Sequence, residues 1–353
     1  MRSSVLAVLK FIVIVVILAS VGAAVYLAHR HLPRFMKEAA PTPVSEPLPP
    51  GQEVIVTIPK GATLSQIGAV LQEKGVISSR LLFRLVALIR GEQRSIKAGD
   101  YALKTGSDAG EVLDQLISGK TIIFSFTVPE GYNIYQISDL FQQSGIMSRQ
   151  EFLALAMDPA FLKELKVDGN SLEGYLFPDT YFLRPSEKSD GKLIVRKMVQ
   201  RFYEVYDKSV RPAAEASGWS TNEVVTLASL IEKEARTSEH GLVSAVFHNR
   251  LRHKMRLQCD PTVIYGIKAM GSKITREDLN KKHSYNTYQI DGLPPGPIAC
   301  PGKASLVAAV NPADVDYLYF VARNDGSHQF SSSLQEHNRW VNLYQRNSKV
   351  QTQ

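Results

Sequence analysis

The stretch from Phe11 to Ala28 contains 18 residues without a charged side chain, most of them Ile, Val, Leu or Ala. An uncharged run of this length is long enough to cross the hydrocarbon core of a bilayer as a helix. The alternative is a cleaved secretory signal, with Arg2 and Lys10 as its basic region and the small residues of 19–24 as its cleavage site. Because the apolar core is too long for such a signal, we expect residues 1–30 to form a cytoplasmic tip and a retained transmembrane anchor.

The basic residues around this run do not fix its orientation. Arg2 and Lys10 precede it, whereas Arg30, Arg34 and Lys37 follow it. Basic residues favour the cytoplasmic side, so their count alone would place the residues after the run in the cytoplasm. A large translocated domain can override that bias. The side of the membrane that holds the bulk of the chain therefore stays open on this argument.

Proline marks the next boundary. Residues 40–51 contain five prolines, which makes them extended and non-helical, and we assign residues 31–51 to a linker. Alternation and helical spacing then predict a small α/β unit at 52–120, with a strand at 53–58 and helices near 63–74, 79–90 and 108–118. A larger, mainly helical unit with a short sheet follows at 121–347, before a tail at 348–353. The predicted fold class is α+β.

The small unit resembles a LysM-like module in its order of strand, helix, helix and strand. The turn from Pro59 to Thr63 that leads into a helix strengthens this similarity. Small units of this kind are widespread, so carbohydrate binding and a purely structural role are both open.

The net charge of +7 raises the question of nucleic acid binding. The basic residues are spread among nearly as many acidic ones, without an Arg/Lys tract or an aromatic-basic module. A solvated basic surface explains the charge, and we expect no nucleic acid partner. An anionic polymer stays open as a ligand.

The only two cysteines, Cys259 and Cys300, lie in turn-rich segments that are 41 positions apart. A disulfide between these loops is our hypothesis, and it would suit an oxidising compartment. The alternative is two buried free thiols.

Two acids, Glu232 and Glu234, lie near the end of a hydrophobic helical run, Leu227–Ala235. At about 100° per residue, Val224, Leu227 and Ile231 share one stripe, while Glu232 and Glu234 flank it on either side. Periodicity does not choose between these glutamates, and a surface ion pair is the ordinary role for either. A carboxylic acid beside aliphatic side chains has a raised pKa, however, and can protonate a leaving oxygen.

Several ordered motifs resemble the MltG (YceG-like) family of endolytic murein transglycosylases. The similarity runs from about residue 53 to 345 and includes a segment upstream of the acids. The motifs are Glu173–Tyr181, Leu230–Glu234, Phe247–Leu251, Met255–Gln258, Asp260–Gly266, Tyr285–Tyr288, Gly292–Ile298, Pro301–Gly302, Asn311–Pro312 and Tyr317–Val321.

This resemblance implies a single-pass protein of the inner membrane with its C-terminal bulk in the periplasm. Such an enzyme cuts nascent glycan strands internally between N-acetylmuramic acid and N-acetylglucosamine and leaves a 1,6-anhydromuramyl end, which could terminate strand elongation. Peptidoglycan synthases of the elongation or division machinery are the partners that the resemblance implies.

The resemblance also implies that Glu232 is the catalytic residue, acting first as a general acid and then as a general base. Other polar residues of the motifs suit a sugar site, although loop-stabilising roles are open for several of them. These substrate-binding candidates are Glu173, Asn249, Arg250, Gln258, Asp260, Tyr285, Asn286 and Tyr288.

No cofactor or metal is expected. His240, His248 and His253 do not share one helical face, and no nearby Cys or Asp completes a compact ligand set. The chain also lacks a phosphate-binding loop of the Walker or dinucleotide type. The alternative to an enzyme is a membrane-tethered scaffold that binds peptidoglycan without cleaving it.

Overall fold

The computed structural model describes residues 49–268, 271–323 and 325–346. The chain divides into two compact units between Ile122 and Ile123. The predicted anchor over residues 11–28 and almost all of the predicted linker lie outside the described residues. Within the described part of the chain, no helix combines the length and the apolar character that crossing a membrane requires.

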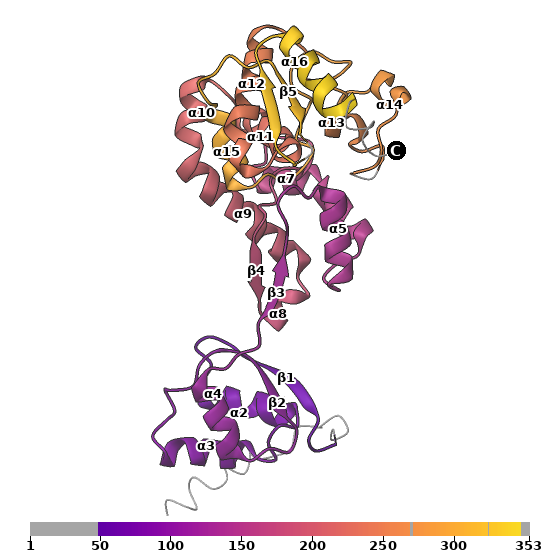
Figure 1. The fold of residues 1–353 in the computed structure, drawn as a ribbon. Coiled ribbons are helices and arrows are strands. Elements are labelled where there is room, and N and C mark those ends of the chain that lie inside the picture. Colours follow the sequence, from indigo (N-terminus) through magenta and orange to yellow (C-terminus); the bar gives the residue numbers. More distant parts are fainter. Residues whose placement is uncertain (1–48, 269–270, 324, 347–353) are drawn as a thin grey trace, which may run out of the picture. The chain divides into compact units, whose positions relative to one another are not determined.

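The first unit consists of three helices and a two-stranded antiparallel sheet (Figure 1). Strand β1 (Glu53–Ile58) pairs with β2 (Gly99–Lys104), and Glu53 lies opposite Lys104. A side-chain oxygen caps the start of each helix, which satisfies backbone N–H groups that lack a partner within the helix. The helices are α2 (Leu64–Glu73), α3 (Arg80–Ile89) and α4 (Ala109–Ser118), capped by Thr63, Ser79 and Asp108 respectively.

The second unit begins with strand β3 (Phe124–Thr127), which pairs antiparallel with β4 (Thr180–Leu183). Three short helices lie between these strands in sequence, and their apolar faces share one core with the first half of α9. The helices are α5 (Ile134–Gln143), α6 (Arg149–Ala156) and α7 (Pro159–Glu164), and α8 (Pro185–Lys188) and α9 (Gly191–Ser209) follow β4.

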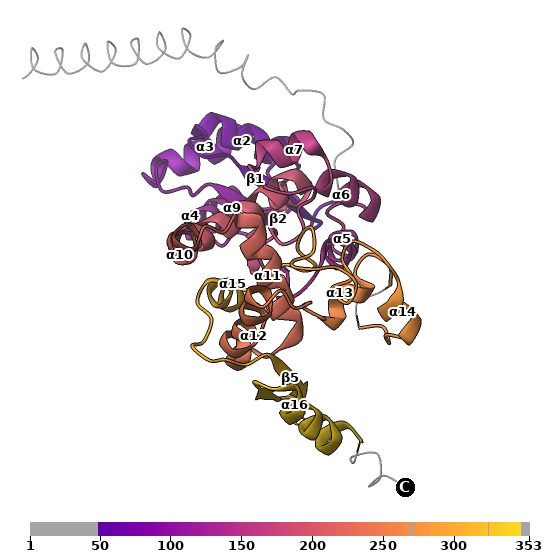
Figure 2. The ribbon, with the colours of Figure 1, turned by 90° about the horizontal axis from the view of Figure 1, so that it is seen from above.

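A second core in this unit forms around α11 (Thr221–Glu234), where α12, α13 and α15 also pack (Figure 2). The remaining elements are α10 (Arg211–Ser217), the short 3₁₀ helix η1 (Thr237–Glu239), α12 (His240–Arg252), α13 (Asp260–Ile264), α14 (Arg276–Asn280), α15 (Lys303–Val310), strands β5 (Tyr319–Ala322) and β6 (His328–Ser331), α16 (Leu334–Val341) and the π-helical turn η2 (Asn342–Arg346).

The mixed α+β class with short sheets is confirmed. The larger unit contains two separate two-stranded sheets, β3–β4 and β5–β6, rather than the one short sheet that we predicted. The region after His253 is rich in loops, but it also contains α13, α14 and α15, which our reading of periodicity missed. These helices have only five to eight residues, which is too short to show a helical period clearly.

Helix α11 is buried on all sides for more than two turns. Every residue from Val224 to Ile231 is buried, including the polar Thr226 and Ser229. The Ser229 hydroxyl donates to the carbonyl of Thr226 and accepts from the backbone N–H of Ile298, so it is satisfied inside the core. We predicted a narrow apolar stripe. The helix is instead buried on every side over these residues. This burial fixes the rotation of the helix about its axis and the direction in which the acids at its end point.

Gly174 allows the loop before β4 to pack against α11. Its φ is +83°, and a Cβ at this position would lie 2.6 Å from Val225 Cγ1 and 2.7 Å from Pro297 Cβ. We expect Gly174→Ala to lower the free energy of unfolding by about 2 to 5 kcal/mol, because it adds left-handed strain and overpacks the core.

Gly218 is the matched control for this change. Its φ is +73°, but no heavy atom lies within 4 Å of a Cβ built there. Gly218→Ala should therefore cost only the backbone strain of about 1 to 2 kcal/mol. Urea denaturation of both variants measures the difference, and equal losses would contradict the packing argument.

Candidate active site

The last turn of α11 sends its two glutamates to opposite sides. Residues two positions apart on a helix differ by about 200° in direction. Glu232 points to the N-terminus of α15, and Glu234 points to the start of α13. The choice between them, which the helical pattern left open, can therefore be made on their separate surroundings.

Glu232 is held as an anchored carboxylate. Its Oε2 accepts hydrogen bonds from the backbone N–H of Gly302 at 3.0 Å and from the hydroxyl of Ser305 at 2.7 Å. Gly302 is the N-cap of α15, so the positive end of that helix also faces this carboxyl group. These two donors and the helix end fix the position of the Glu232 carboxyl group and occupy its Oε2.

A short hydrogen-bond network extends from Glu232. The Ser305 hydroxyl lies 3.1 Å from His240 Nδ1, and His240 Nε2 lies 3.0 Å from the carbonyl of Ala235. The Ser305 hydroxyl therefore lies between the Glu232 carboxyl group and the His240 ring. The network joins the end of α11 to the start of α15.

Glu130 also belongs to this group, and the sequence reasoning gave it no role. A Cβ at Gly302 would collide with the Glu130 carboxyl group, which shows how closely the loop after β3 approaches the start of α15. Partial burial and the negative charge of Glu232 raise the pKa of Glu130, whereas His240 lowers it. Only its place between Pro129 and Gly131, two residues that favour turns, could have drawn attention to it.

Glu234 has the properties of a general acid. Burial raises its pKa from the ordinary 4.5 to about 7, and the nearby charge of Asp260 acts in the same direction. The thiol of Cys259, the backbone N–H of Asp260 and the charge of Arg250 oppose this shift without cancelling it. A carboxyl group with a pKa near 7 is protonated often enough at neutral pH to donate a proton.

Glu234 also lines a cavity of about 320 Å³. Helix α13, the hairpin of β5 and β6, and helix α16 provide other parts of its wall. The lining residues are Glu234, Arg250, Leu257, Gln258, Asp260, Tyr288, Phe320, Val321, Ala322, His328, His337, Val341 and Gln345.

Four of the predicted substrate-binding residues, Arg250, Gln258, Asp260 and Tyr288, line this cavity together. The Tyr288 hydroxyl donates to Asp260 Oδ1 at 2.6 Å. Arg250 is buried and donates to the carbonyls of Leu318 and Leu257, which holds its charge beside the cavity.

Two further candidates hold the fold together instead. The Asn249 amide donates to the carbonyls of Val315 and Tyr317, and the buried Asn286 amide donates to three carbonyls in and after α14. His328 and His337, which the sequence reasoning missed, do line the cavity; His328 forms an ion pair of 2.8 Å with Glu239 when it is protonated. No short motif marks either histidine as part of a site.

Glu173 is buried and caps a helix. Its carboxyl oxygens accept from the backbone N–H of Ile134, at the start of α5, and one of them accepts from the Tyr265 hydroxyl at 2.7 Å. Burial raises its pKa to about 7, although these hydrogen bonds oppose the shift. With 2% of its surface exposed, Glu173 does not meet a substrate in this structure.

The disulfide that we expected is not formed. Cys259 and Cys300 are free and buried, and they belong to different hydrophobic cores. The Cys300 Sγ lies 3.9 Å from Glu173 Oε1, and the Cys259 thiol is hydrogen-bonded to Glu234. Each thiol therefore has a glutamate as its neighbour, which the spacing of the cysteines could not reveal.

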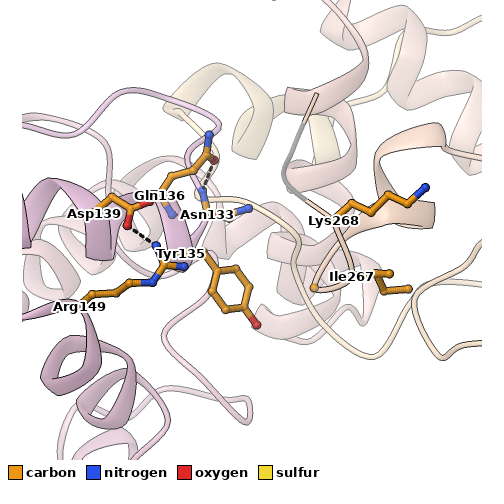
Figure 3. Close-up of a pocket in the computed structure, with 8 residues that line it drawn as sticks. Asn133, Tyr135, Gln136, Asp139, Arg149, Ile267 and Lys268 are labelled. Atoms are coloured by element: carbon orange, nitrogen blue, oxygen red, sulfur yellow. Dashed lines mark hydrogen bonds and ion pairs between the residues drawn. The ribbon is translucent and has the colours of Figure 1, made fainter. Parts of the chain in front are cut away.

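A second hollow, of about 430 Å³, lies between the start of α5 and the segment after α13 (Figure 3). The Tyr135 side chain extends into it, Asp139 and Arg149 form an ion pair on one side, and Lys268 lies on the other. The positive charge of Arg149 therefore balances the negative charge of Asp139 in this hollow. The candidate Tyr285 lines an adjoining hollow of about 260 Å³ that also includes Tyr135, so it lies apart from the Glu234 cavity.

No group of three or more His, Cys, Asp or Glu side chains that could hold a metal ion occurs among the residues that the structure describes.

Comparison with known proteins agrees with the motifs. The model of a family described as YceG-like matches residues 56–343. An endolytic murein transglycosylase of Bacillus subtilis strain 168 is 34% identical over 309 residues, which cover 82% of this chain and 84% of that protein. An endolytic murein transglycosylase of Streptococcus pneumoniae serotype 2 is 29% identical over 326 residues, and the match spans 82% of this chain but 58% of that longer protein.

The fold is also similar to a solved structure. The 2.6 Å crystal structure of a YceG-like protein from Listeria monocytogenes aligns with a TM-score of 0.57 and 33% sequence identity. The alignment covers 82% of this chain and 99% of that one.

The raised pKa of Glu173 predicts how stability changes with pH. Between pH 4.5 and 7 the folded state holds a proton on Glu173 that the unfolded state has lost, so stability falls as pH rises through this window. At about 1.4 kcal/mol per pKa unit, the free energy of unfolding is lower by roughly 3 kcal/mol above pH 7 than at low pH. We expect Glu173→Gln to be close to the parent in stability at pH 4.5 and more stable than it at pH 8.

Glu187→Gln is the control with the opposite sign. Burial opposes the shift, but hydrogen bonds and the charge from Arg184 and Lys197 lower the pKa of Glu187 to about 2. This variant should lose stability relative to the parent above pH 4.5, and the loss should disappear as pH falls towards 2. Urea denaturation at several pH values measures both, and a difference for Glu173→Gln that did not change with pH would contradict the assignment.

Proposed function

The chain belongs to the YceG-like family, and from this premise we propose that it is a membrane-anchored endolytic transglycosylase of peptidoglycan. It would cut nascent glycan strands between N-acetylmuramic acid and N-acetylglucosamine and leave a 1,6-anhydromuramyl end. The names of the curated relatives support murein as the substrate class. The uncharged run at 11–28 supports an anchor in the inner membrane, with the C-terminal bulk in the periplasm.

The observation that carries this proposal is the state of Glu234, an acid with a pKa of about 7 beside a cavity of about 320 Å³. Bond cleavage in a glycan needs a proton donor, because an alkoxide is a poor leaving group. Glu232 was the residue that the family resemblance implied, and that assignment stays a prediction. Its Oε2 is occupied by two donors at the start of α15, whereas Glu234 lines the cavity, so the geometry favours Glu234 as the acid.

One carboxyl group can serve both steps of this reaction. Protonated Glu234 gives its proton to the glycosidic oxygen as the bond to muramyl C1 breaks through an oxocarbenium-like state. The Glu234 carboxylate then takes the proton of the muramyl C6 hydroxyl as that oxygen bonds to C1. Glu234 ends the cycle protonated, and no water is consumed.

The other groups of the cavity support these steps. The negative charge of Asp260 keeps the pKa of Glu234 high before bond cleavage. The Asp260 and Tyr288 pair and the side chain of Gln258 offer hydrogen-bonding groups for sugar hydroxyls and acetamido groups. Arg250 keeps a positive charge close to the cavity after the proton has left Glu234.

Further roles follow from the same proposal. An enzyme that cuts new strands at the membrane could terminate their elongation, which would make peptidoglycan synthases of the elongation or division machinery its partners. A membrane-tethered scaffold that binds glycan without cleaving it is the alternative, and the variants below distinguish the two.

Two matched variants test the identity of the acid. We expect Glu234→Gln to lower the rate of glycan cleavage by about 10² to 10⁴-fold, because a glutamine cannot transfer the proton. Glu232→Gln can still accept from Gly302 and Ser305, so its loss should be less than about tenfold. The measurement is the release of soluble fragments from uncrosslinked glycan strands, with glycan binding and circular dichroism as controls.

The opposite order of losses would return the role to Glu232. Unchanged cleavage in both variants would remove both acids from the mechanism, and binding without cleavage by the parent protein would favour the scaffold.

The pH profile tests the protonation state. If free Glu234 must be protonated, kcat/KM should fall about tenfold per pH unit above a break near pH 7. Asp260→Asn removes a negative charge that raises the pKa of Glu234, so the break should move to lower pH in this variant. A profile that rose with pH through 7 would contradict an acid role for Glu234.

A further inference from the structure

Helix α3 of the first unit has an apolar face that is exposed among the residues that the structure describes. Leu82, Leu85 and Leu88 are each about half exposed, at 49%, 50% and 52%, and Ile89 is 76% exposed. The opposite face of the same helix packs into the core through Phe83 and Ala87, which are fully buried. Large apolar side chains that gather on an exposed surface often mark an interaction site, so this exposed face requires a reason.

The exposed residues form one continuous surface. At about 100° per residue, Leu82, Leu85 and Ile89 lie within about 60° of one another, and Leu88 extends the same side. Contacts with α2 and α4 occupy the other side of α3. We call Leu82, Leu85, Leu88 and Ile89 the outer face of α3. The helix itself lies at the edge of the first unit in Figure 1.

Positive charge accompanies this face. Between residues 80 and 97 the chain has five basic side chains and a single acid, Glu92. Arg94 and Lys97, which follow the helix, are exposed, and Arg90 at its C-terminal end pairs with the exposed Asp114. The basic side chains of this segment are Arg80, Arg84, Arg90, Arg94 and Lys97. An exposed apolar face with basic residues beside it is typical of helices that lie in the interface of an anionic bilayer.

Only a short spacer separates the proposed anchor from the first unit in the sequence. The uncharged run ends at Ala28, and the first described residue is Pro49, which leaves 20 residues between them. At about 3.1 Å per residue, even a fully extended proline-rich spacer of that length covers only about 60 Å. A domain of about 70 residues has a radius of gyration near 11 Å, so any face of it can turn to the membrane on such a tether.

We propose that the outer face of α3 lies on the surface of the bilayer that holds the proposed anchor. The leucines and Ile89 enter the boundary between headgroups and acyl chains, and the nearby Arg and Lys side chains meet lipid phosphates. This inference rests on the membrane anchoring of the proposed function. It makes the first unit a second membrane contact, in addition to any role in binding glycan.

A local probe in the full chain tests this proposal. Ile89→Cys carries the environment-sensitive fluorophore NBD, and the chain is incorporated into nanodiscs that contain anionic lipid. Cys259 and Cys300 are buried, so the introduced thiol is the one that reacts, and the parent chain serves as the labelling blank. Glu53→Cys, on the exposed end of β1, carries the same label as a matched control.

We expect the emission at position 89 to shift to shorter wavelength and to be quenched by nitroxide-labelled lipid, while the label at position 53 stays in water. Adding Leu85→Glu and Leu88→Glu should remove both effects at position 89, because charged side chains do not enter the interface. Both substituted residues are exposed, and circular dichroism checks that the variant stays folded.

Three results would overturn the proposal. One is equal emission at positions 89 and 53 in chains that are incorporated into nanodiscs. Another is a shift at position 89 without quenching by lipid, because protein would then cover this face, either another segment of this chain or a second copy. The third is retention of the shift in the Leu85→Glu, Leu88→Glu variant. Failure of the chain to enter nanodiscs at all would instead contradict the anchor and, with it, the premise of this inference.

Discussion

The burial of α11 is the constraint on which the site depends. Eight consecutive residues, from Val224 to Ile231, have no freedom to turn towards solvent, so the next turn must leave the core in a fixed direction. Two acids then project to opposite sides, and each meets a different environment. Glu232 meets the donors at the start of α15, whereas Glu234 meets the thiol of Cys259, a second acid and the charge of Arg250. The end of one helix therefore places two acids in different surroundings, and burial raises the pKa of Glu234.

Local features of the fold could be predicted from the sequence. The first strand was predicted with its observed bounds, and the three helices of the first unit were predicted close to theirs. These signals depend on residues close together in the chain. The strand β4 and the short helices α13 and α15 were missed, because pairing with β3 and packing on α11 stabilise them more than their own sequence patterns do.

Distant contacts explain what the sequence could not predict at the site. Glu234 owes its raised pKa to burial and to Asp260, which lies 26 positions later in the chain, and no helical pattern contains that information. The spacing of the cysteines suggested a bond between them, but each thiol lies beside a different glutamate. Motif similarity was more useful than periodicity, because it selected Arg250, Gln258, Asp260 and Tyr288, which the fold brings into one cavity with Glu234.

The central claim is that a single carboxyl group cuts the strand while the sugar's own C6 hydroxyl closes the ring. Mass spectrometry of fragments released from uncrosslinked glycan strands in ¹⁸O-labelled water tests this most directly. The account predicts 1,6-anhydromuramyl ends that carry no ¹⁸O, because water takes no part in the reaction. Reducing muramyl ends that carry ¹⁸O would mean hydrolysis, and they would contradict the account.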